Sequence, residues 1–101
     1  MERGKKMEKL FITFRSEEDI IAFVEVCCEY DDAIDIRVGK MLTDAKSILG
    51  MLLLKTGETF EIEYGCYDSE DNYSQFREEI LKKFQVTVKG EPDKRTSMAN
   101  L

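Results

Sequence analysis

The side chains that could do chemistry in this chain are few, because its 101 residues include no histidine. Histidine is the side chain most easily used for proton or phosphoryl relay near neutral pH, and it is a common metal ligand. The three cysteines, Cys27, Cys28 and Cys66, are odd in number and form no C-x-x-C pair. This pattern favours free thiols in a reducing compartment over a disulfide framework or a zinc site. We therefore expect no metal and no cofactor.

Two serines precede the first turns of predicted helices. Ser16 stands before Glu17, Glu18 and Asp19, so it is predicted to cap a helix, with Asp19 in the position of a capping-box acceptor. The three carboxylates would complement the helix dipole themselves and would repel a phosphate. Ser47 stands before a short apolar run, and it is predicted to cap that helix.

Charge and hydropathy narrow the class of protein. A net charge of −6 and a pI of about 4.7 argue against a nucleic-acid partner, which demands a basic surface. A basic protein surface is a more natural partner, although acidity also serves solubility alone. The longest apolar stretch, Ile48–Leu54, is interrupted by Gly50 and is too short to span a bilayer. Because the N-terminal segment MERGKKMEK also lacks the apolar core of a signal peptide, we expect a cytoplasmic protein with no membrane insertion.

Periodicity indicates the fold class. Alternating apolar residues predict four strands, and apolar residues three or four apart predict three helices. The order β-α-β-β-α-β-α indicates an α+β fold, a two-layer sandwich with helices on one sheet face and water on the other. We expect a single domain of residues 9–88, a charged lead of residues 1–8 and a disordered tail of residues 89–101. The strands are expected at 10–14, 33–38, 41–43 and 59–64, and the helices at 16–29, 47–54 and 69–84.

The segment GKMLTDAKSILGML, residues 39–52, resembles the histidine-containing phosphocarrier (HPr) family of the bacterial sugar phosphotransferase system. The flanking pattern agrees, since a helix with Phe23-Val24 near its end is followed by an aspartate-rich turn and then by I-x-I-x-V. The resemblance covers roughly residues 9–84. It implies an open-faced two-layer β-sandwich, with a four-stranded antiparallel sheet in the order 1-4-2-3 and three helices on one face.

The resemblance also implies what the chain has lost. It places Ser16 where the family has its phosphorylated histidine, Glu18 where the family has arginine and Asp19 where it has proline. We therefore expect no phosphohistidine, no catalytic residue and no enzymatic activity. Ser47 matches the family's regulatory serine, which a dedicated ATP-dependent HPr kinase phosphorylates, and Lys46 and Lys40 could screen the added charge.

The same resemblance implies a docking surface made of Lys46, Ile48, Met51 and Leu52. In relatives this surface binds the HPr kinase, a transcriptional regulator and phosphotransferase-system components, although some of these apolar residues could instead belong to the core. The leading hypothesis is a non-catalytic regulatory or protein-binding module of carbon catabolite regulation. A decoy or inhibitor of phosphotransferase-system enzymes is one alternative, and a divergent small-ligand binder on the same fold is another.

Overall fold

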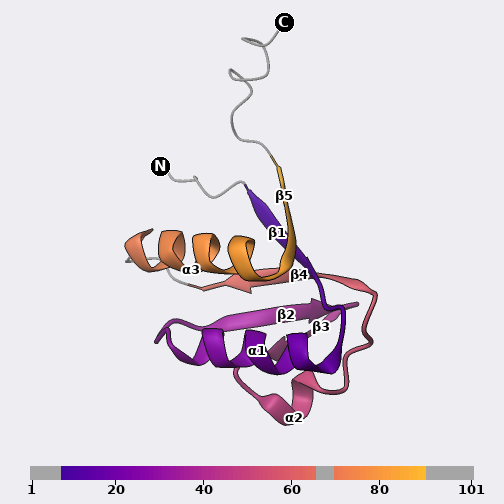
Figure 1. Ribbon diagram of the computed structural model, residues 1–101. Helices are drawn as coiled ribbons and strands as arrows, with labels where there is room; N and C mark the ends of the chain where they lie inside the picture. The colour runs from indigo at the N-terminus through magenta and orange to yellow at the C-terminus, as the bar shows by residue number, and fades with distance from the viewer. Residues whose placement is uncertain (1–7, 66–69, 91–101) are drawn as a thin grey trace, which may run out of the picture.

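The computed structural model describes residues 8–65 and 70–90. Within these residues the chain forms five strands and three helices (Figure 1). The α+β class predicted from the sequence is confirmed. In chain order the elements are β1 (Lys9–Thr13), α1 (Glu17–Cys28), β2 (Ile34–Val38), β3 (Met41–Asp44), α2 (Ile48–Met51), β4 (Thr59–Tyr64), α3 (Glu70–Lys83) and β5 (Gln85–Lys89).

The strands form one antiparallel sheet in the order β3-β2-β4-β1-β5. The prediction of four strands is wrong, because β5 pairs with β1 along its whole length, from Lys9 opposite Lys89 to Thr13 opposite Gln85. The other four strands are neighbours in the order β1-β4-β2-β3. β5 ends at Lys89, and of the tail predicted for residues 89–101 only residues 89 and 90 belong to the described part of the chain.

The core lies between the inner face of the sheet and the two long helices, which run along it in Figure 1. Alternate strand residues point inward, and α1 and α3 contribute their apolar stripes. Phe23 of α1 is the centre of an aromatic cluster, with ring centroids 5.4 Å from Phe14, 6.2 Å from Phe76 and 5.6 Å from Phe84. Such edge-on contacts add to the free energy gained by burying the rings. The residues that are less than 2% exposed include Phe14, Phe23, Phe76, Ile12, Ile20, Ile34, Ile36, Met51, Ile80 and Cys27.

The outer face of the sheet carries mostly charged and polar residues at the alternate positions, with Phe11 and Leu42 as its apolar members. Arg37 on β2 donates from Nε to Glu63 on β4 at 2.8 Å and lies 3.9 Å from a carboxylate oxygen of Glu61. The hydroxyls of Thr13 and Thr59 are hydrogen-bonded across β1 and β4 at 2.7 Å. These cross-strand pairs stabilise a face that no described helix covers.

Candidate functional site

The N-terminus of α1 is closed by its own side chains. Ser16 has an extended backbone, and its Oγ accepts a hydrogen bond from Asp19 N at 3.2 Å, so the predicted cap is confirmed. The carboxylate of Asp19 accepts from the backbone N and from the side chain of Arg15, at 3.0 Å in each case. Asp19 therefore acts as an acceptor in the predicted capping-box position, but the backbone amide that donates to it is that of Arg15 and not that of Ser16.

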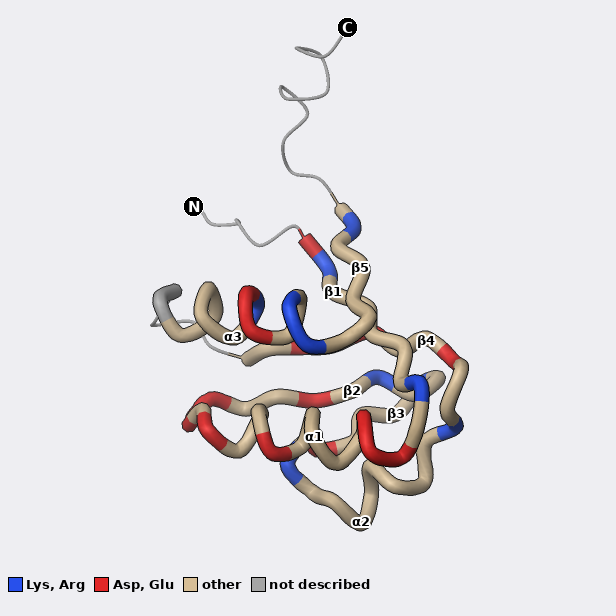
Figure 2. Tube along the Cα trace, in the orientation of Figure 1, with Lys and Arg blue, Asp and Glu red and all other residues tan. Residues whose placement is uncertain are grey.

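This arrangement does not favour an anion. Figure 2 shows acidic positions along the first turn of α1, where Glu17 and Glu18 are exposed. The nearby Arg15 guanidinium is already paired with Asp19, and that hydrogen bond holds the pKa of Asp19 below its usual range. A phosphate at Ser16 would meet three carboxylates and would have to break the cap.

Ser47 is placed differently, although it also precedes a helix. It is the N-cap residue of α2, is exposed and makes no side-chain cap hydrogen bond. Its backbone is held on both sides, because Ser47 N donates to Asp44 O at 3.0 Å and Ser47 O accepts from Met51 N at 2.9 Å. The structure therefore presents a fixed segment with a hydroxyl that is not used by the fold.

The helix after Ser47 spans only four residues, Ile48–Met51. Since the macrodipole is the sum of aligned peptide dipoles, its contribution to holding a phosphate here is small. Gly50 lets this helix lie close to β3, because a Cβ at that position would be 3.3 Å from Thr43 Cγ2. Ser47 Oγ would be 3.6 Å from the same Cβ, so the hydroxyl lies over the surface that Gly50 leaves open.

The two lysines expected to screen a phosphate at Ser47 are not placed for it. Lys46 is half-buried, and its ammonium donates to the backbone carbonyl of Tyr30, just beyond the end of α1. Lys40 lies in the turn between β2 and β3, at the far end of β3 from Ser47. Lys46 therefore links the segment before α2 to the turn after α1, instead of presenting a free charge to a partner.

The apolar docking surface differs from the predicted one. Met51 is 0% exposed and belongs to the core, so a partner cannot reach its side chain in this conformation. Leu52 is half-buried, whereas Ile48 is 36% exposed. The most exposed residues of the segment are Leu49, at 78%, and Leu53, at 83%. We call Ile48, Leu49 and Leu53 the α2 patch. Sequence reasoning missed the last two, because every residue around Gly50 is apolar and no period distinguishes an outward face.

The two cysteines that the structure describes are free thiols. Cys27 is buried in α1, and burial raises the pKa of its thiol. Cys28 is exposed, with its Sγ 4.0 Å from Lys46 O, and Cys66 lies outside the described residues. Among the residues that the structure does describe, no group of histidine, cysteine and carboxylate side chains is arranged to hold a metal ion.

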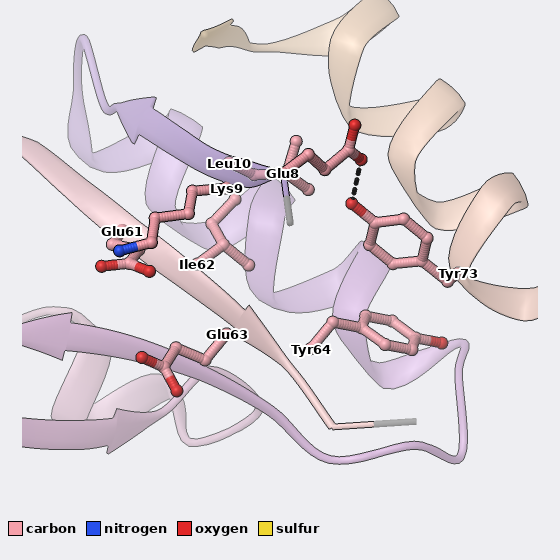
Figure 3. A pocket seen from close by; sticks show the side chains of 8 residues that line it. All are labelled: Glu8, Lys9, Leu10, Glu61, Ile62, Glu63, Tyr64 and Tyr73. Atoms are coloured by element: carbon pink, nitrogen blue, oxygen red, sulfur yellow. Dashed lines mark hydrogen bonds between the residues drawn. The ribbon is translucent and has the colours of Figure 1, made fainter. Parts of the chain in front are cut away.

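A cavity of about 250 Å³ opens where β1 and β4 separate beyond the Leu10–Ile62 pair (Figure 3). Its carboxylates are matched by arginines of the protein itself. Glu8 accepts hydrogen bonds from Tyr73 and from Arg77 Nε. Arg37 is paired with the other two carboxylates, those of Glu61 and Glu63. These pairings do not favour a charged small ligand. The cavity is lined by Glu8, Lys9, Leu10, Glu61, Ile62, Glu63, Tyr64 and Tyr73.

A comparison with models of protein families and a comparison with curated proteins both gave no match. Across residues 8–65 and 70–90, no helix has the length and apolar content needed to cross a membrane.

Proposed function

We propose that this chain is a non-catalytic, HPr-like regulatory module that binds a protein partner and is switched by phosphorylation of Ser47. The observation that carries the proposal is the exposed Ser47 hydroxyl, which caps no helix and stands beside the α2 patch. It lies in the segment on which the resemblance to the HPr family rests. Ser16, by contrast, uses its hydroxyl to cap α1.

The chemistry of the switch is simple at this position. A kinase transfers the γ-phosphoryl group of ATP to Ser47 Oγ, and the hydroxyl proton leaves with ADP as the other product. Because this oxygen makes no cap hydrogen bond, modification costs the fold little. The group adds about 1.5 to 2 negative charges at neutral pH, immediately next to Ile48 and Leu49. The modified surface therefore combines apolar side chains with a dianion.

The charge of the surrounding surface indicates the kind of partner. The exposed side of α1 carries Glu17, Glu18 and Glu25, the exposed Glu29 follows as its C-cap, and α1 contacts α2. A phosphate at Ser47 adds to this acidity, so we infer a partner with an apolar contact flanked by lysines and arginines. Arginine is well suited to such a site, since its guanidinium binds phosphate through two parallel hydrogen bonds.

The test is intact-mass spectrometry after incubation with ATP and the HPr kinase of the same organism. We expect one added phosphate on the wild-type chain and none on Ser47→Ala. The matched control is Ser74→Ala, since Ser74 is exposed on α3, far in the sequence from the motif at residues 39–52, and this variant should be modified like wild type. No phosphate on any chain, with a kinase shown to act on a histidine-bearing HPr, would rule out the switch. Competition with that HPr for Enzyme I would then test the decoy hypothesis.

A further inference from the structure

The two edges of the sheet differ in what they expose. β5 presents Gln85, Thr87 and Lys89 to solvent, and polar residues with a lysine are a common protection of a sheet edge. β3, at the other edge, leaves Met41 70% and Leu42 48% exposed. An edge with exposed apolar residues is suited to receive another strand.

The hairpin between β2 and β3 determines which backbone groups of β3 face outward. Gly39 has a φ of 63° and Lys40 has a negative φ, so Gly39-Lys40 is a type II′ turn closed by the Val38–Met41 pair. Hydrogen-bonded and non-hydrogen-bonded pairs alternate along an antiparallel ladder. Met41 and Thr43 therefore bond to β2, whereas the N–H groups of Leu42 and Asp44 point away from the sheet.

We propose that a second copy of this chain pairs antiparallel with β3, about a two-fold axis at Leu42. Each Leu42 then exchanges two hydrogen bonds with the Leu42 of the other copy. The residues on either side complement each other, because Lys40 of one copy lies opposite Asp44 of the other, twice in the dimer. Leu42 and Asp44 are exposed on the outer face of β3, and Lys40 is exposed in the turn that precedes it. A lysine and an aspartate therefore flank the Leu42 pair on each side of the axis.

The charges at this edge support a second copy as the occupant rather than an unrelated strand. Asp35 and Asp44 are directly opposite each other on β2 and β3, and among the described residues neither forms an ion pair. Burial, then Asp44 and Glu63, raise the pKa of Asp35. Asp44 Oδ1 does accept from Lys46 N at 2.9 Å, but that donor is a neutral amide. The incoming Lys40 supplies the cation that this acidic pair lacks.

The length of β3 limits the strength of the association. Four residues at roughly 3.4 Å each give an edge of about 14 Å. An interface of this size lies at the weak end of specific contacts, with a dissociation constant on the order of 10 μM to 1 mM. The net charge of −6 also opposes self-association.

The register predicts a specific set of amides that respond to concentration. In backbone NMR of the labelled full chain, we expect the Leu42 amide to exchange rapidly with solvent at about 10 μM and more slowly toward about 1 mM, a range that spans the expected dissociation constant. The Thr43 amide should be protected at both concentrations, because it bonds to β2 in the monomer. An unchanged Leu42 amide, with a monomeric sedimentation coefficient throughout, would overturn the proposal.

Charge reversal tests the pairing itself by sedimentation velocity. Lys40→Glu alone and Asp44→Lys alone should each be monomeric, since like charges then meet twice. An equimolar mixture of the two should form a heterodimer in which both pairs are attractive. Lys82→Glu, an exposed position on α3 with the same charge change, should dimerise like wild type. Circular dichroism checks that each variant is folded. Dimerisation that is indifferent to these reversals would exclude the proposed register.

Discussion

Replacing Met51 by alanine tests the most consequential difference between the predicted and the observed surface around Ser47. The sequence places Met51 in a docking surface, whereas the structure buries it completely between α2 and the core. The matched control is Leu49→Ala, two positions earlier in the same short helix, where the side chain is 78% exposed. Both substitutions remove side-chain atoms beyond Cβ, so a difference between them reports burial.

The expected magnitude follows from the buried groups. Truncating Met51 removes three heavy-atom groups from the core, and at about 0.8 kcal/mol each the lost transfer free energy is about 2.4 kcal/mol. A residual cavity on the order of 50 Å³ adds about 1 kcal/mol at ~24 cal/mol per Å³. We therefore expect Met51→Ala to lower the free energy of unfolding by about 3 kcal/mol, in line with buried methionines elsewhere. Leu49→Ala should change it by less than about 0.5 kcal/mol.

Urea unfolding followed by far-UV circular dichroism measures both values, because the chain has no tryptophan to report by fluorescence. A loss of about 3 kcal/mol corresponds to a fall in Tm of roughly 15 °C for a domain of this size. The effects on partner binding should be the reverse of the effects on stability. Leu49→Ala should weaken binding, and folded Met51→Ala should bind like the wild type. If Met51→Ala cost less than Leu49→Ala, the orientation of α2 described above would be wrong.

Three further predictions concern charge and the last strand. Asp19→Asn should lower the free energy of unfolding by about 1 kcal/mol at pH 7. Because the hydrogen bond from Arg15 lowers the pKa of Asp19, the difference between variant and wild type should shrink as the pH falls below 3.8, the ordinary pKa of this carboxyl. A difference that does not depend on pH would contradict this. Asp35→Asn should raise the Tm at pH 7. Burial is the largest cause of the raised pKa of Asp35, so the charged carboxylate destabilises the fold. The gain in Tm should disappear below pH 3.8, and a lower Tm at pH 7 would refute the prediction. A chain ending at Phe84 should be less stable than one ending at Gly90 by on the order of 2 kcal/mol, since it loses the half-buried Val86 and Val88; equal urea midpoints would show that β5 contributes nothing.

Local patterns were sufficient to predict most elements. The helix expected at 16–29 is observed as Glu17–Cys28 with Ser16 as its cap, and the strand expected at 33–38 is Ile34–Val38. These segments have a clear period and unambiguous turn or cap residues at their ends, so local and tertiary preferences agree. The helix expected at 69–84 is likewise Glu70–Lys83.

The fifth strand shows how an expected topology can hide a local signal. Gln85–Lys89 alternates polar residues with Val86 and Val88, which is the pattern of a strand with one face toward a core. Because the resemblance implies a sheet of four strands, no strand is predicted from the sequence for the segment after Phe84. Its pairing with β1 depends on contacts far apart in sequence, which no local pattern reveals.

The segment around Ser47 could not be predicted in the same way. Nearly every residue from Ile48 to Leu54 is apolar, so the sequence does not say which side chains face the core. The outcome is decided by tertiary contacts, such as the close approach that Gly50 allows to Thr43. The hydrogen bond from Lys46 to the carbonyl of Tyr30 is also a tertiary feature. A lysine predicted to be a surface charge instead links the segment before α2 to the turn after α1.

Ser16 and Ser47 carry the physical argument for the proposed switch, because the same residue type at the same nominal position has two different roles. α1 has 12 residues, and the amide of Asp19 in its first turn donates to the hydroxyl of Ser16, so modifying that oxygen would remove a cap worth about 1 kcal/mol. α2 is a single turn, and its hydrogen bonds from Met51 N to Ser47 O and from Leu52 N to Ile48 O involve backbone atoms only. The hydroxyl of Ser47 can therefore change its chemistry while the fold around it stays the same.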